Sequence, residues 1–183
     1  SEKNDLSDTA TNVGAGGGVY NSCLYMCRAP VAGLCESWDG TSWTEVAETN
    51  TGRENNGGAG SSNTSAMTFG GQTPPLTANT EVWDGSSWTE VNELNTARRY
   101  GSMSGASVND AMYASGYPSP KTQTEVWNGT SWTEVAEVAT PGYSIGGAPA
   151  GGSTVSIKTG GQSPNVTVEE WTVSLGNKTI TSS

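Results

Sequence analysis

The chain has no histidine and few charged residues, and both shortages narrow the functions it can have. No His occurs among its 183 residues, and only 14% of them are Asp, Glu, Lys or Arg. Without His there is no Ser-His-Asp triad, no Cys-His pair, no histidine-ligated zinc and no imidazole general base. We therefore expect no catalytic, metal-binding or cofactor-binding residues, and a protein that is not an enzyme.

Basic residues and long apolar runs are also scarce. Only 8 Lys and Arg stand against 18 Asp and Glu, a formal net charge of −10. Duplex nucleic acid and anionic membranes bind clustered Lys and Arg, so neither is an expected partner. No apolar run approaches the roughly 20 residues of a membrane helix, so no membrane insertion is expected. Residues 1–5, SEKND, do not open a signal peptide and lack an initiator Met, so we expect a C-terminal portion of a longer polypeptide.

What the sequence does contain is a repeat. The segment EVWDGSSWTEV at 81–91 recurs as EVWNGTSWTEV at 125–135, as ESWDGTSWTEV at 36–46 and, shortened, as EEWTV at 169–173. The first Trp of each copy falls at 38, 83, 127 and 171, in steps of 45, 44 and 44 residues. A period of this length is typical of propeller blades or helical arrays. The abundance of Gly, Ser, Thr, Val and Trp, without a 3.6-residue apolar stripe, favours short strands.

The repeat predicts one all-β domain over 1–183, in four units at about 1–48, 49–93, 94–137 and 138–183. Asp-Gly or Asn-Gly between two Trp residues predicts a tight hairpin turn, which places Trp83 directly opposite Trp88. In the second unit we expect strands near 57–61, 65–70, 79–83 and 88–92. The same spacing predicts a last strand at 178–182 and no helix longer than about one turn.

Two further landmarks identify a family resemblance. An apolar strand ends in diglycine at 66–71, AMTFGG, and at 156–161, SIKTGG, and a small-residue–Arg stretch, LNTARRYG, occupies 94–101. With the Trp pairs these residues resemble the kelch repeat, and the phrase TEVWNGTSWTEV resembles kelch-like arrays of marine bacteriophage tail and virion proteins. The resemblance implies a β-propeller of four-stranded antiparallel blades, four in this chain, forming a closed ring or part of a larger one. The residues that carry the structural repeat are Trp38, Trp43, Trp83, Trp88, Trp127, Trp132, Trp171, Gly70, Gly71, Gly160 and Gly161.

Several residues have both a functional and a structural interpretation. The Trp pairs could form a sugar-binding platform, but their recurrence at one repeat position favours packing between neighbouring blades. Carboxylates also recur, at Glu36, Glu81 and Glu125 and at Glu45, Glu90 and Glu134. A glycosidase pair needs two different environments, whereas equivalent positions give equivalent ones, so we expect solvated strand faces. Arg98 and Arg99 stand out among the eight basic residues, and Arg53 occupies the position that matches Arg98. We expect these arginines to be structural and to bind backbone carbonyls.

The first and third units depart from the diglycine pattern, and all cysteines lie in the first. Cys27-Arg28 and Ser115-Gly116 replace Gly-Gly, so altered turns are expected there. Cys27 and Cys35 could lie on adjacent strands and form a disulfide, leaving Cys23 free or paired between chains, or all three could be small buried residues. The spacing of the three is not that of a zinc site.

Two variable segments, 72–79 and 117–124, are the expected contact loops, because each contains Pro and Pro lowers the cost of ordering a loop. Their candidate residues are Gln72, Pro74, Pro75, Tyr117, Pro118 and Pro120.

We expect a non-enzymatic structural or binding module. The resemblance implies a phage tail fibre or surface appendage at the virion surface or outside a cell. Its partners would be a host surface glycan or protein receptor, other virion subunits or further copies of the chain. The alternatives are a carbohydrate-binding adhesion repeat protein of a cell and a glycan-active enzyme domain.

Overall fold

The computed structural model describes residues 4–6, 15–27, 33–118, 122–143, 146–147, 151–160 and 167–172. These residues form strands, turns and irregular segments without a helix, so the all-β prediction is confirmed for this part of the chain. Within it, no helix is long and apolar enough to cross a membrane. The expected strand at 178–182, as well as Gly161 and Pro120, lies outside the described residues.

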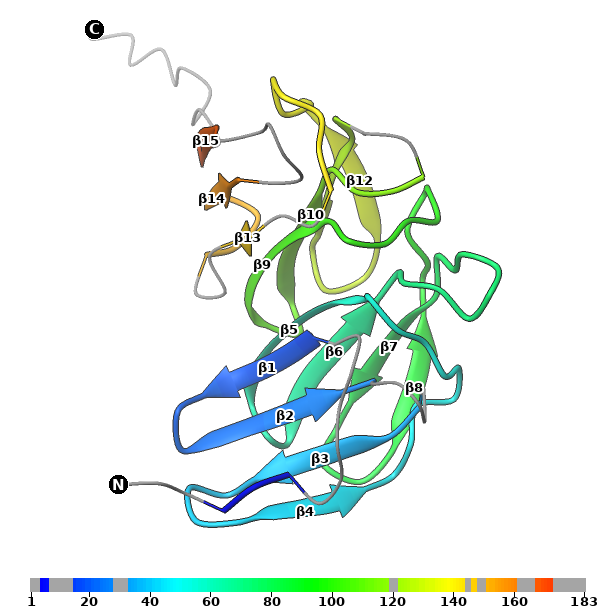
Figure 1. Cartoon of the computed structure of the whole chain (residues 1–183), viewed down its shortest axis with the longest axis vertical. Helices are drawn as coiled ribbons and strands as arrows, with labels where there is room; N and C mark the ends of the chain where they lie inside the picture. Colours follow the sequence, from blue (N-terminus) through cyan, green and yellow to red (C-terminus); the bar gives the residue numbers. More distant parts are fainter. Residues whose placement is uncertain are drawn as a thin grey trace, which may run out of the picture.

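The strands form four antiparallel sheets, each within one sequence unit (Figure 1). Sheet 1 contains β1 (Ala15–Val19), β2 (Ser22–Met26), β3 (Cys35–Trp38) and β4 (Trp43–Val46). Sheet 2 contains β5 (Gly57–Ser62), β6 (Ser65–Phe69), β7 (Thr80–Trp83) and β8 (Trp88–Val91). Sheet 3 contains β9 (Ser102–Ser107), β10 (Asp110–Ala114), β11 (Thr124–Trp127) and β12 (Trp132–Val135). Sheet 4 contains β13 (Gly146–Gly147), β14 (Val155–Thr159) and β15 (Val168–Thr172).

Each sheet is a meander in which strands adjacent in sequence pair with one another. The strands of sheet 2 lie within one residue of the ranges that the sequence predicts. The two strands around each Asp-Gly or Asn-Gly turn pair so that the two Trp residues are directly opposite. The cross-strand Trp prediction is therefore confirmed in three units, at Trp38–Trp43, Trp83–Trp88 and Trp127–Trp132.

The sheets follow one another from sheet 1 to sheet 4, which lie at opposite ends of the view in Figure 1. Their first strands meet along the inside of this series, where β5 lies against both β1 and β9. Glycine permits this approach. A Cβ added to Gly105 would lie 2.6 Å from the Cβ of Ala59, and one added to Gly17 would lie 2.6 Å from the Ala59 carbonyl oxygen. The glycine-rich inner strands thus allow backbones of neighbouring sheets to come into contact.

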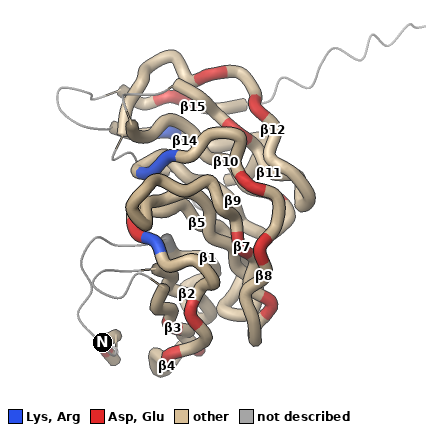
Figure 2. Tube along the Cα trace, turned by 90° about the vertical axis from the view of Figure 1, so that its right-hand side faces the viewer, with Lys and Arg blue, Asp and Glu red and all other residues tan. Residues whose placement is uncertain are grey.

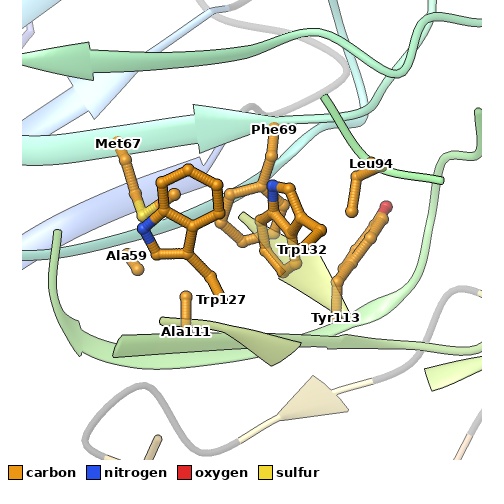
Figure 3. Close-up of a cluster of buried hydrophobic side chains, with 8 residues drawn as sticks. All are labelled: Ala59, Met67, Phe69, Leu94, Ala111, Tyr113, Trp127 and Trp132. Carbon is orange, nitrogen blue, oxygen red and sulfur yellow. The ribbon is translucent and has the colours of Figure 1, made fainter. Parts of the chain in front are cut away.

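Large side chains fill the space between the outer parts of neighbouring sheets. Between sheets 2 and 3, the Phe69 ring contacts the rings of Trp132 and Tyr113 edge-on, with centroids 4.8 and 5.2 Å apart (Figure 3). Trp127 and Met67 belong to the same buried cluster. Between sheets 1 and 2, an equivalent cluster contains Trp83, Trp88, Leu24, Met26 and Cys35. The packing interpretation of these Trp residues is confirmed.

The first residue of the turn after the second strand has nearly the same positive φ in all four units, so the expected alteration in units one and three is wrong at this residue. Cys27 and Ser115 adopt φ angles of 59° and 63°, beside 63° and 66° for Gly70 and Gly160. A left-handed conformation costs about 1–2 kcal/mol for a residue with a side chain. Cys27 and Ser115 thus adopt the left-handed conformation without glycine.

Candidate functional site

The recurrent glutamates of the third strands are buried, which corrects the expectation that they are solvated. Glu36, Glu81 and Glu125 are at most 1% exposed. Their counterparts on the fourth strands, Glu45, Glu90 and Glu134, are exposed as expected. Burial of a carboxylate is costly unless charged and hydrogen-bonded partners surround it.

In units two and three the partners come from the linker that precedes the sheet. Glu81 forms an ion pair with Arg53 and accepts hydrogen bonds from the backbone N–H groups of Asn50 and Thr51, at 2.7 and 3.1 Å. Glu125 forms an ion pair with Arg98 and accepts from the backbone N–H of Asn95, at 2.7 Å. The carboxylate therefore anchors the linker to its sheet.

The two arginines also confirm the predicted role in binding backbone carbonyls. Arg53 donates to the carbonyl oxygens of Gly70 and Thr51, at 3.3 and 3.1 Å. Arg98 donates to those of Tyr113 and Thr96, at 2.7 and 3.1 Å. The sequence did not reveal that a buried carboxylate completes each network.

In the fourth unit the equivalent carboxylate, Glu169, is neutralised by a cation at a different position. Gly142 stands where the linkers of units two and three have Arg. Lys158 on β14 lies directly opposite Glu169, with Nζ 3.0 Å from Oε1. The backbone N–H groups of Ala139 and Thr140 again donate to the carboxylate, at 2.6 and 3.0 Å. Burial alone would raise the pKa of Glu169, but hydrogen bonds from Lys158, Ala139 and Thr140 hold the pKa below its ordinary value. The glutamates are thus committed to structure in every unit where their partners are described.

The indole groups of the first Trp in each unit are likewise committed. Trp83 and Trp127 donate from Nε1 to the carbonyl oxygens of Asn63 and Val108, both at 2.9 Å, within the turn between the first two strands of their own sheets. Trp38 and Trp171 make the corresponding bonds to Tyr20 and Ser153, both at 3.1 Å. Trp38, Trp83 and Trp127 are buried, so their ring faces are closed to a sugar.

Trp43 differs from its counterparts Trp88 and Trp132, because no described sheet precedes sheet 1. It is half-buried and lines a cavity of about 330 Å³ with Cys23 and Tyr25 of sheet 1, which Gly60 of sheet 2 and Gly105 of sheet 3 also line. Trp43 lies where a preceding sheet would pack by analogy with sheets 2 and 3.

The three cysteines are free thiols, with Cys27 and Cys35 buried and Cys23 half-buried. The disulfide considered from the sequence is not formed. A hydrogen bond from the Cys35 thiol lowers the pKa of Cys27, and the same contact together with burial raises that of Cys35. Among the described residues, no three His, Cys, Asp or Glu side chains gather as metal ligands would.

The expected contact loops meet the linkers at one edge of the molecule. Glu54 of one linker and Gln72 of the first loop exchange two backbone hydrogen bonds, both 3.0 Å long. One unit later, Arg99 and Tyr117 make the same pair of bonds, at 3.1 and 2.8 Å. We call the surface formed by Glu54, Gln72, Arg99, Tyr100, Tyr117 and Tyr143 the loop face. Figure 2 shows the blue Lys and Arg segments along one side of the trace, whereas most red acidic segments lie elsewhere.

Arg99 is at the centre of the loop face. Its Cζ lies 4.7 Å from the ring centroid of Tyr100 and 4.9 Å from that of Tyr117. Its Nη1 donates to Oε1 of Gln72, whose Nε2 donates to Glu54 at 3.0 Å. Tyr143 meets Tyr117 edge-on, with centroids 5.8 Å apart. The structure therefore brings the predicted residues Gln72 and Tyr117 together through Arg99, a residue that the sequence did not assign to ligand contact.

The remaining predicted loop residues flank this arrangement. Pro74 and Pro75 are exposed beyond Gln72, and Pro118 is exposed beyond Tyr117. The loop face thus joins a polar centre to an apolar margin, as ligand sites commonly do.

In comparisons with known proteins, no family model and no curated protein matches the chain.

Proposed function

We propose that the chain is a kelch-like β-propeller, or part of one, that acts as a non-enzymatic binding module through its loop face. The observation that carries this proposal is a difference between residues at one repeat position. The residue after the Arg position of the linker is Glu54, Arg99 or Tyr143 in successive units, and its backbone partner is Gln72 or Tyr117. Backbone geometry is constant while side-chain chemistry changes.

The framework around these positions supports the same conclusion. The adjacent Arg–Glu pairs and Trp pairs repeat in type and contact, because they hold linker and sheet together. A scaffold whose constant residues are buried and whose variable residues share one face is suited to recognition. Glu81, Glu125 and Glu169 are used in ion pairs, which favours binding over glycoside hydrolysis.

The end faces of the series support a propeller. Val155, Ile157 and Val168 on the outer face of sheet 4 are 57, 36 and 63% exposed. Ile157 occupies the position of Met67, which belongs to the buried cluster between sheets 2 and 3. Trp43 on sheet 1 occupies the position of Trp132 in that cluster. The outer face of sheet 4 thus matches one side of the interface between sheets 2 and 3, and the outer face of sheet 1 matches the other side. We propose that in a ring each of these faces packs against a face of the complementary kind.

The expected targets follow from the resemblance to phage virion arrays and from the chemistry of the loop face. Tyr rings, a guanidinium and an amide are the groups that bind sugars by stacking and hydrogen bonding. We propose a host surface glycan as the target, with the module displayed on a virion.

A glycan array that includes neutral and acidic oligosaccharides tests the proposed function. We expect retention of at least one glycan without product release, and weaker retention by Tyr117→Ala. Tyr20→Ala is the matched control, because Tyr20 is 92% exposed in the turn between β1 and β2, outside the loop face. Absence of retention across the array would contradict glycan binding, and release of shortened oligosaccharides would establish the enzyme alternative.

A further inference from the structure

Arg99 differs from the other cations of the described residues. Arg53, Arg98 and Lys158 each form an ion pair with a glutamate. Arg99 has no carboxylate within salt-bridge distance among the described residues. It follows Arg98 directly in sequence. Arg98 is therefore the structural cation of this pair of neighbours, and Arg99 is the one without a described counter-charge.

The guanidinium of Arg99 is nevertheless held in place. Its backbone is paired with Tyr117, its Nη1 is bound to Gln72, and the rings of Tyr100 and Tyr117 lie on it. Its Nε is buried and has no hydrogen-bond partner among the described groups, so this N–H is closed to a ligand. Nη2 donates to no described residue and is the group left to contact one. A fixed cation with an unused donor is preorganised to receive an anion.

The neighbouring residues restrict what that anion can be. A single guanidinium matches one carboxylate in charge and geometry, whereas polyphosphate chains bind through several cations. Glu54 is bound to the amide of Gln72, on the other side of that amide from Arg99. The half-exposed ring of Tyr117, with Tyr143 against it, offers an apolar surface beside the cation. A ring that carries a carboxylate and presents a face of C–H groups satisfies both.

We propose that the loop face binds the carboxylate of an acidic sugar, such as a hexuronate, on the Arg99 guanidinium, with the sugar ring against Tyr117. This inference rests on the proposed function, because it specifies the class of glycan that the same face takes. Gln72 fixes the guanidinium through Nη1, and the Tyr100 ring lies 4.7 Å from its Cζ.

Calorimetric titration of the 183-residue chain with uronate tetrasaccharides and with their carboxyl-reduced counterparts tests the inference. We expect reduction of the carboxylates to weaken binding at least 10-fold. Arg99→Gln should produce the same loss for the acidic sugar and no change for the reduced one. Arg99→Lys should recover only part of the affinity, because it keeps the charge without the planar fork.

Two control variants separate this contact from general effects. Tyr117→Ala should weaken the binding of both acidic and reduced sugars, because it removes the ring on which the sugar stacks. Tyr20→Ala should leave both affinities unchanged, and thermal melting should show that all variants remain folded.

Each contrary result has a distinct meaning. Equal binding of acidic and reduced sugars, or an Arg99→Gln variant with unchanged affinity, would overturn the carboxylate inference while leaving glycan binding in place. Binding of neutral sugars alone would do the same. An Arg99-dependent interaction with a Glu-rich peptide, but with no uronate, would replace the sugar by a protein partner. Failure of every glycan, acidic or neutral, would overturn both proposals.

Discussion

Single residues show how the same buried carboxylate can be neutralised in two ways. In units two and three the cation is an Arg of the linker, and in unit four it is Lys158 on the neighbouring strand. Because Gly142 leaves the Arg position empty in unit four, the Lys is the sole charged partner of Glu169 among the described residues. The Lys158–Glu169 pair therefore tests whether stability requires a cation at one particular position or only a cation beside the carboxylate.

Lys158→Met should destabilise the chain by about 3 kcal/mol, because it removes one partner of a largely buried ion pair. Urea unfolding measures the change. Adding Gly142→Arg should restore part of the loss by supplying the cation from the linker, as Arg98 does for Glu125. If the double variant is no more stable than Lys158→Met, the two positions are not interchangeable.

The burial of these glutamates could not be predicted from strand alternation. Side chains two residues apart on a strand lie on the same face, so Glu81 lies on the face of Trp83 and Glu90 on the face of Trp88. Glu81 is nevertheless buried and Glu90 exposed, because the linker that carries Arg53 contacts Glu81. The unpaired state of Arg99 likewise depends on tertiary contacts that adjacent Arg residues do not reveal.

At the level of strands and hairpins, the sequence was sufficient to predict the strand limits and the pairing of the Trp residues. The period, the Asp-Gly or Asn-Gly dipeptides and the Trp spacing together define strand limits and register, because a hairpin turn determines which residues are opposite. The conformation of Cys27 and Ser115 was not predictable in the same way. Local preference opposes a positive φ at both, and both nevertheless adopt one.

Trp83→Ala should destabilise the chain by about 3–5 kcal/mol, the range for removal of a large buried aromatic side chain. Trp43→Ala should cost clearly less when sheet 1 has no neighbour, because Trp43 is only half-buried. Chemical denaturation of the two variants gives both values. An unchanged melting temperature for Trp83→Ala, together with lost glycan affinity, would instead support a sugar platform.

The Asp-Gly turn gives a prediction about acid. Asp84 accepts hydrogen bonds from the backbone N–H groups of Ser87 and Ser86, which lower its pKa to about 2. A depressed pKa stabilises the fold above the ordinary value near 3.8, and this contribution is lost as the pH falls toward 2.

Asp84→Asn should therefore make stability less dependent on pH between about 4 and 2, without breaking the turn. Asn128 already makes the equivalent bonds to Thr130 and Ser131, at 2.9 and 3.0 Å. Thermal melting across this pH range measures the slope. A slope equal to that of the unmodified chain would show that the carboxylate contributes nothing there.

For the whole molecule, the exposed end faces matter most. Sheet 4 presents Val155, Ile157 and Val168, and sheet 1 presents Trp43 beside a cavity. Exposed apolar faces of terminal repeats require a cover for solubility. Ring closure within the chain and association with another copy would both cover these faces. The two arrangements differ in mass, because only the second contains more than one chain.

Ile157→Glu should disrupt this contact by placing a charge in an apolar interface. Scattering and mass measurements at several concentrations distinguish the two arrangements. A falling mass indicates contact between copies, and a larger radius of gyration at constant mass indicates closure within the chain. If neither quantity changes, sheet 4 does not use this face.

The exchange of backbone hydrogen bonds at Glu54–Gln72 and Arg99–Tyr117 has an evolutionary consequence. Because these bonds involve no side-chain atom, mutation at the four positions can alter recognition without disturbing the scaffold. A duplicated or recombined unit would likewise bring its own anchoring pair and its own variable residues. New binding preferences could therefore arise by shuffling 44- or 45-residue cassettes, with selection acting on two or three side chains in each.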